Sequence, residues 1–412
     1  ITRSLTNLIT NKSTGNSMVN SIIGVNGLIK YGKTVLSPTT QVRNFASAGL
    51  FTVANGHFDY SHMRKAMATM NDYIKDGDKN GYRSYYKHLV EMGVLYDTPN
   101  AGILQEMLEA GDATFQWLDD ASAIGGRTGD VINATKGAGK AVSNMAQKFY
   151  RAGDDFWKIV GFENEKANLA AAKPQWSNEQ VEAEAARRIR ATYPTYSLTG
   201  AAFKALSKFP LMGTFVSFPA EVIRTNINIV RQIQSDLADP DLRPLARKRI
   251  IGMLVAHSWA AAAATLSAAA AGLTGDEEEA IRKLGSPWSE NSSLLVWGRD
   301  EDGNIQTVDM SFIDPYNLLH KPFIAMLRDQ PVEDALMGSL IDFVSPFLGA
   351  DIAAGAIFEV LANDKIRGGQ VYNSDAPADE VMVEIAGHLS KAMGPGFINP
   401  IHKTIKAIGG QR

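Results

Sequence analysis

Acidic and basic side chains that could carry chemistry are concentrated in one segment of the chain. The segment contains Arg151, Asp154, Asp155, Lys158, Glu163, Glu165 and Lys166. Two carboxylates can serve as the acid and base of a glycosidase, or they can hold two metal ions when His or Glu recurs at matched spacing. That spacing is missing here, whereas Asp154 and Lys158 lie one helical turn apart. The segment therefore predicts surface and interhelical ion pairs.

A short glycine motif suggests phosphate binding. Gly137-Ala138-Gly139-Lys140 resembles the end of a phosphate-binding loop. That loop needs another glycine five residues before its last one, and a Ser or Thr after its lysine. Ala134 and Ala141 occupy those positions, so we interpret the segment as a flexible linker.

Histidine and cysteine give no indication of a reactive centre. The seven histidines are scattered as His57, His62, His88, His257, His320, His388 and His402. Only His88 and His388 have a glutamate at helical spacing, and such pairs arise often by chance. Cysteine is absent, which excludes disulfides, thiolate zinc sites and cysteine nucleophiles. The sequence predicts no catalytic residue, no metal site and no cofactor, and no nucleophile-elbow pattern is present.

Basic residues cluster in the second half of the chain. The cluster consists of Arg224, Arg231, Arg243, Arg247, Lys248 and Arg249. One interpretation is a solvated helix face or an anchor beside a membrane, and the other is contact with phosphates of DNA or lipid. The sequence leaves both open.

The residues after this cluster form the most unusual feature of the chain. Ile250 to Leu273 contains no Asp, Glu, Lys or Arg, and Asp276 to Glu279 is acidic. Its length suits a membrane-spanning helix, and its charged flanks fit the positive-inside pattern. Its alanine-rich composition equally suits a helix buried in a helical assembly. Candidate membrane-facing residues are Ile250, Leu254, Trp259, Leu266 and Leu273.

The composition limits the function classes. The 412 residues are 45% hydrophobic and 21% charged, which is enough apolar material for folded cores. The formal net charge is −3, whereas proteins that coat nucleic acid are strongly basic. Any contact with DNA must therefore be local.

The hydrophobic pattern predicts a mainly α-helical, elongated multi-helix assembly with one small β-hairpin near 294–310. Apolar residues recur at helical spacing in 16–36, 101–123 and 141–172. Asp76 to Gly81 predicts a loop. Two β-prone runs flank Glu301-Asp302-Gly303-Asn304, a typical hairpin turn.

Five regions follow from these patterns. We expect an N-terminal helical region, a central helical region with the basic segment, the alanine-rich apolar helix, a linker region containing the hairpin, and C-terminal apolar helices with a basic tail. Their predicted ranges are 1–124, 125–249, 250–273, 274–330 and 331–412.

Three segments, in order, resemble elements of the large internal virion proteins of tailed bacteriophages, also called large polyvalent proteins. The first is Leu36–Asn44, with the pattern S-P-x-T-x-x-R-N. The second is Arg151–Lys158 followed by Phe162 and Glu163, with the pattern D-x-F-x-K. The third is the aromatic and proline-rich Phe209–Ala220 followed by Arg224-Thr225-Asn226. The resemblance covers roughly residues 30 to 360.

The resemblance implies an ejection protein of a short-tailed phage. Such proteins lie inside the capsid near the portal, leave with the genome, and form a channel for DNA across the host envelope. The implied partners are other internal virion proteins, portal or tail proteins, phage DNA, the host inner membrane and further copies of the chain. The chain begins at Ile1, and we expect it to be the C-terminal portion of a longer protein. Some relatives carry a lytic transglycosylase domain, which these residues do not match.

Two features agree with that expectation. A chain without cysteine has no crosslinks that oppose unfolding in a narrow tail. Small residues at helical spacing, which allow close packing in membranes, are Gly252, Ala256, Ala260 and Ala264. Two alternatives remain: the scaffold region of a peptidoglycan-cleaving virion enzyme, and an architectural module of the capsid core or portal.

Overall fold

The computed structural model describes most of the chain between residues 35 and 393. The described ranges are 37–75, 82–95, 127–195, 217–284, 292–317, 319–320, 359–365 and 369–393, with Val35 and Ala356. Predicted helices 16–36 and 101–123, the loop 76–81, Phe209–Val216 and most of the region after 320 lie outside these residues.

The described residues are mainly helical, with one two-stranded antiparallel hairpin. The helices are α3 (Pro38–Ala54), α4 (Met63–Ile74), α5 (Tyr82–Glu91), α7 (Arg127–Ala172), α8 (Asn178–Thr192), α10 (Ser217–Ala238), α11 (Arg243–Ala270), α12 (Gly275–Leu284) and α16 (Ala378–Met393). The strands are β1 (Leu294–Arg299) and β2 (Ile305–Asp309), and short 3₁₀ turns occupy Tyr60–His62 and Met310–Phe312.

Two helices begin at caps that the sequence encodes. Ser37 accepts a hydrogen bond from the backbone of Thr40, and Pro38 occupies the first turn of α3. Ser177 and Gln180 form a reciprocal capping box at the start of α8. These caps satisfy backbone N–H groups that the first helical turn leaves unpaired.

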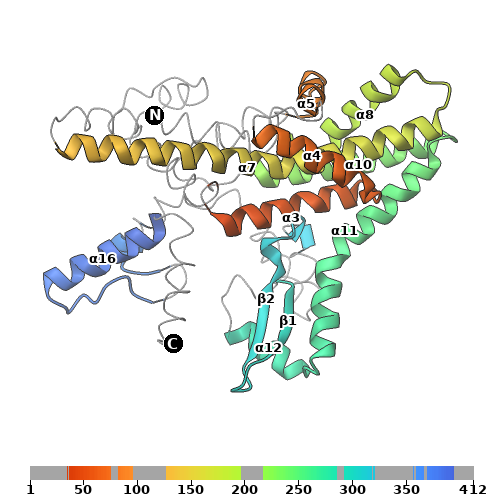
Figure 1. Cartoon of the computed structure of the whole chain (residues 1–412). Helices are drawn as coiled ribbons and strands as arrows, with labels where there is room; N and C mark the ends of the chain where they lie inside the picture. Colours follow the sequence, from red (N-terminus) through yellow and green to blue (C-terminus); the bar gives the residue numbers. More distant parts are fainter. Residues whose placement is uncertain are drawn as a thin grey trace, which may run out of the picture.

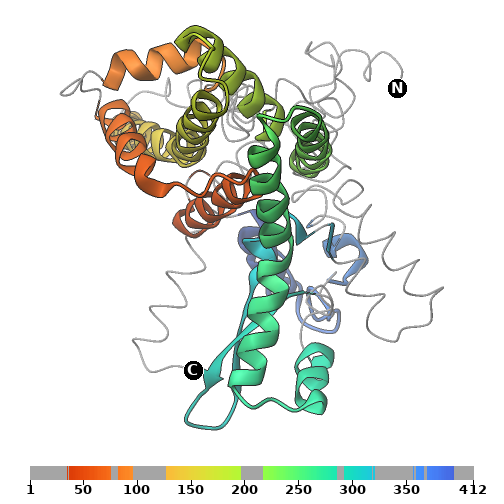
Figure 2. The ribbon, with the colours of Figure 1, turned by 90° about the vertical axis from the view of Figure 1, so that its right-hand side faces the viewer.

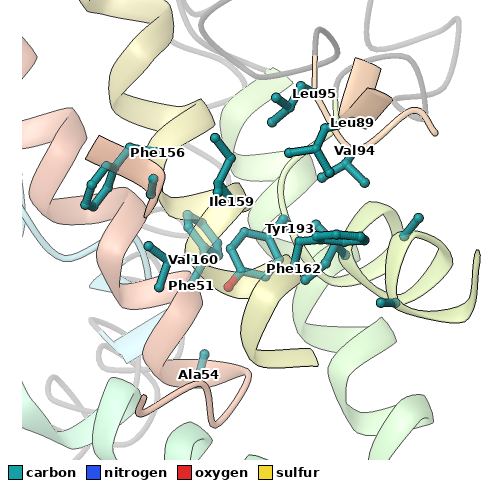
Figure 3. Close-up of a cluster of buried hydrophobic side chains, with 14 of the residues drawn as sticks. Phe51, Ala54, Leu89, Val94, Leu95, Phe156, Ile159, Val160, Phe162 and Tyr193 are labelled. Carbon is teal, nitrogen blue, oxygen red and sulfur yellow. The ribbon is translucent and has the colours of Figure 1, made fainter. Parts of the chain in front are cut away.

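Six helices and the first half of α11 form a helical body around one apolar core. Helix α7 contacts α3, α4 and α8, while α10 packs on α8 and α11 (Figure 1). Figure 3 shows Phe51 of α3 and Val160 and Phe162 of α7 gathered near Tyr193, at the end of α8. This body is made of α3, α4, α5, α7, α8, α10 and residues 243–256 of α11.

The second half of α11 runs out of the body, and the hairpin and α12 lie beside it. Figures 1 and 2 show this arm, which we define as residues 257–284 and 292–309. The strands pair from Leu294 with Asp309 to Arg299 with Ile305, with a bulge between Val296 and Gly298. In the turn, Asp300 accepts backbone hydrogen bonds from Asp302 and Asn304.

The predicted helical class and the hairpin are confirmed, and one local prediction is wrong. Gly137–Lys140, predicted as a linker, lies inside the continuous helix α7. The predicted border between 249 and 250 falls inside α11, which begins at Arg243 with Pro244 in its first turn. The basic residues and the apolar run therefore belong to one helix.

Candidate membrane-contact helix

A buried ion-pair network fixes α11 to the helical body. Arg249 of α11 contacts Glu165 of α7 at 2.5 Å and also pairs with Asp236 of α10. Arg188 of α8 contacts the same two carboxylates at 2.9 and 3.0 Å. None of the four side chains is more than 3% exposed. Two cations and two anions thus neutralise each other where four helices meet.

His57, in the turn after α3, extends this network. Its Nε2 lies 2.8 Å from Glu165 and its Nδ1 lies 3.0 Å from the Tyr193 hydroxyl. Burial lowers the pKa of His57 despite its bond to Glu165, so the ring is neutral and donates to that carboxylate. Burial alone would raise the pKa of Glu165, but Arg249, His57 and Arg188 hold it well below its usual range.

A stripe of small residues lets α11 approach its neighbours closely. A Cβ atom on Gly252 would lie 2.1 Å from the carbonyl oxygen of Val53. Gly56 adopts a positive φ of 72° beside the backbone of Lys248, a conformation that glycine adopts most easily. Further along the same stripe, Ala256, Ala260 and Ala264 are buried. The small residues therefore pack within this chain.

The opposite side of α11 exposes large apolar side chains. We call it the apolar face, and it consists of Ile250, Ile251, Leu254, Val255 and Leu266. Leu254 is 66% exposed and Leu266 is 70% exposed. Among the described residues, α11 is the one helix long and apolar enough to cross a membrane, and only 22% of its most apolar stretch is buried. A core helix of a water-soluble protein would be mostly buried.

The hairpin covers part of the second half of α11. The Ser267 hydroxyl accepts a hydrogen bond of 2.9 Å from the backbone N–H of Val296 in β1. The other two candidate membrane-facing residues, Trp259 and Leu273, are partly buried. The apolar face is therefore narrower than the sequence suggested.

The structure separates the predicted basic contacts into two groups. Arg249 is buried in the ion-pair network, so its interpretation as a surface phosphate contact is corrected. Arg224 pairs with Glu221 at 2.7 Å and donates to the carbonyl oxygens of Ala191 and Tyr193 at the end of α8. Exposed side chains are those of Arg231, Arg243, Arg247 and Lys248. Three of these four lie in the first two turns of α11.

The carboxylate-rich segment of α7 forms interhelical contacts, as the sequence predicted, but inside the body more than on its surface. Glu163 pairs with Lys65 of α4 at 2.8 Å. Asp155 accepts a hydrogen bond of 2.9 Å from the Tyr86 hydroxyl of α5, and burial raises the pKa of Asp155 to about 6. These carboxylates organise helix packing.

The second segment of the phage resemblance packs against α3, just after the first segment, in the body. Phe45 of α3 packs against Phe156 and Trp157 of α7, with ring centroids 5.4 and 5.3 Å apart. Gly49 leaves room for Trp157, because a Cβ atom there would lie 3.0 Å from that ring. Phe156 and Trp157 of the second motif therefore determine, with Phe45 and Gly49 of α3, how α3 crosses α7.

One polar contact has no signal in the sequence. His257 of α11 lies 2.8 Å from His320, which follows the hairpin. The two residues are 63 positions apart, and neither belongs to a recognisable motif.

Comparisons with known proteins add no relative. No family model, no curated protein and no solved structure matches the chain. The site must therefore be interpreted from its own geometry.

Proposed function

We propose that this chain is an internal virion protein of a tailed bacteriophage that helps to form a channel across the host envelope for genome delivery. The observation that carries the proposal is α11, whose apolar face is open while its first turns are basic. The three ordered motifs support the phage assignment. In this proposed role, α11 contacts the host inner membrane after ejection.

The dimensions of α11 suit this role. Its 28 residues give a length of roughly 42 Å, compared with about 30 Å for the hydrocarbon core of a bilayer. Arg243, Arg247 and Lys248 are exposed at one end and can reach anionic headgroups there. The apolar face follows within the next turns. Such a helix can lie in the membrane interface with its present fold.

A full crossing needs one change in the arm. The strands beside α11 carry the polar side chains Gln306, Thr307 and Asp309, and polar groups are costly in hydrocarbon. The hairpin must therefore leave the second half of α11 before that half can be surrounded by lipid. We infer that the present fold is the form stored in the capsid.

Vesicle flotation tests the membrane contact. We expect the purified chain to float with phosphatidylcholine vesicles that contain phosphatidylglycerol, and to float less as salt screens the basic residues. Changing Leu254→Glu and Leu266→Glu together should weaken binding at least about tenfold, since each leucine contributes on the order of 1 kcal/mol. Leu361→Glu is the matched control, because Leu361 is 75% exposed on another helix.

The outcomes separate the alternatives. No flotation at any phosphatidylglycerol content, with the apolar face buried between copies in solution, favours an architectural module of the capsid core or portal. Hydrolysis of peptidoglycan in a zymogram favours the scaffold of a virion enzyme. The phage assignment itself fails if the chain neither sediments with purified virions nor reaches the host envelope after infection.

A further inference from the structure

A chain of hydrogen bonds joins the arm to the body at the middle of α11. His257 Nδ1 lies 2.8 Å from His320 Nε2, and His257 Nε2 lies 2.8 Å from Asn226 Oδ1 of α10. At the other end, His320 Nδ1 lies 3.1 Å from Asp314 Oδ2. We call these four side chains the histidine clasp. It connects the segment after the hairpin to α11 and α10.

The number of protons in the clasp follows from its two ends. Asn226 donates its Nδ2 to the carbonyl oxygen of Val222 at 2.8 Å, so its Oδ1 faces His257 and can only accept. The Asp314 carboxylate also only accepts. The outer nitrogens of both histidines must therefore donate, and the central bond needs a third proton. Three protons on two imidazole rings make one of the rings a cation.

Of the two rings, His320 is the one that faces a carboxylate. The side chain of Asp314 is 2% exposed and that of His320 is 18% exposed. Among the described residues, no lysine or arginine pairs with Asp314, and His320 is its ion-pair partner. Burial, reinforced by the nearby His320, lowers the pKa of His257 to about 4, which keeps His257 neutral.

The remaining neighbours of His257 are uncharged. The Tyr316 ring stacks on it at a centroid distance of 4.4 Å, and burial raises the pKa of this phenol well above its usual value. Helix α3 contributes Phe51, whose ring meets Tyr316 edge-on at 5.5 Å. The ionisable groups that act on His257 are therefore His320 and Asp314.

We propose that the histidine clasp is a proton-dependent latch that is closed most tightly with one shared cation and opens when the pair either gains or loses a proton. The closed pair holds one excess proton. When the segment opens at low pH, both free histidines are protonated and the pair takes up a proton. At high pH both are neutral and the pair releases one.

This proton count gives a quantitative profile. With free histidines at their ordinary pKa of about 6.5, the opening equilibrium should be smallest near that pH. It should rise about eightfold at a pH 1.5 units lower, and by a similar factor 1.5 units higher. A single titrating group would give a change in one direction only.

Hydrogen exchange on the full chain measures this opening. The amides of Asp314, Tyr316, Leu319 and His320 are hydrogen-bonded within the segment after the hairpin, residues 310–320. Their exchange rates, corrected for intrinsic pH dependence, should pass through a minimum near pH 6.5. Rates that are flat from pH 5 to 8, or that change in one direction only, overturn the proposal. This measurement on the unmodified chain needs no variant.

Variants assign the profile to the clasp. Glutamine can still form hydrogen bonds but does not titrate, so His320→Gln should abolish the minimum. His88→Gln is the matched control, because His88 pairs with Glu182 at 3.1 Å on the surface of the body. A minimum that persists in His320→Gln contradicts the assignment. Should that variant lose its helical signal, Asp314→Asn provides the same test, since it removes the countercharge.

The clasp also bears on membrane contact, and this step rests on the proposed function. An open clasp frees the segment after the hairpin and so favours exposure of the second half of α11. Flotation should therefore be stronger at pH 5 than at pH 6.5. Equal flotation at both pH values with an intact exchange minimum overturns only this link. No flotation at any pH overturns the proposed membrane contact and leaves the clasp standing.

Discussion

Replacing Arg249 should destabilise the helical body much more than removing an exposed positive charge from the same helix. Arg249→Met preserves most of the side-chain length but leaves Glu165 and Asp236 without one of their two cations. Removing one partner of a buried ion pair costs about 3–5 kcal/mol. Because Arg188 still contacts both carboxylates, we expect the lower end, about 3 kcal/mol.

Urea unfolding monitored by circular dichroism measures this loss. Lys248→Met is the matched control, since it removes a positive charge at the adjacent position of the same helix. Lys248 is exposed and bonds only Asn168 among the described residues, at 2.7 Å. The control should change the free energy of unfolding by less than about 0.5 kcal/mol.

A second variant tests the charge balance directly. Adding Glu165→Gln to Arg249→Met restores the neutrality of the ion-pair network. The double variant should therefore lose about 1–2 kcal/mol less unfolding free energy than the sum of the losses in the two single variants. Equal stability of Arg249→Met and Lys248→Met would refute the reasoning, because Arg249 would then be as dispensable as a surface lysine.

Two further predictions follow from local geometry. Gly252→Val should lower the free energy of unfolding by at least about 2 kcal/mol, because its Cβ would meet the Val53 carbonyl at 2.1 Å. Gly387→Ala, whose Cβ meets nothing within 4 Å, should not destabilise the chain in the same urea unfolding experiment. Asp155→Asn should remove a contribution to stability that decreases as pH rises from 4 to 6. Burial raises the pKa of Asp155 to about 6, so its contribution is present below pH 4 and lost as pH rises through 6. A steeper wild-type loss on acidification than in Asp155→Asn would contradict this.

The sequence predicted the elements whose signals are local. The hairpin follows from β-prone runs around an Asp-Gly turn, and the structure places that turn at residues 300–304. Helix α8 follows from Pro174 and the Ser177 cap. Gly137–Lys140 was misinterpreted because glycines weaken helices, whereas here they lie in the long helix α7.

The inward position of Arg249 was also predictable in part. In Arg247-Lys248-Arg249 the three cations look equivalent in the sequence. However, Arg249 lies three residues before Gly252 and four after Leu245, in the phase of the buried stripe. The helical phase thus predicts that Arg249 lies on the buried side of α11. The partners Glu165 and Asp236 come from distant segments, so the network itself could not be predicted.

The histidine clasp illustrates contacts that sequence patterns do not encode. His257 and His320 meet because the chain reverses through α12 and the hairpin before returning to α11. Loop and strand lengths, rather than a motif, determine that register. The same holds for His57, which reaches Glu165 across 108 positions.

Site-specific labelling of the apolar face tests the central claim most directly. Because the chain has no cysteine, a single Leu266→Cys variant can carry one environment-sensitive fluorophore. We predict that phosphatidylglycerol-containing vesicles shift its emission to the blue, and that a quencher attached to lipid tails quenches it. The same label at Leu361→Cys should respond to neither. An unchanged, unquenched signal at position 266 while the chain floats with vesicles would show that another surface contacts the membrane, and would contradict the role of α11.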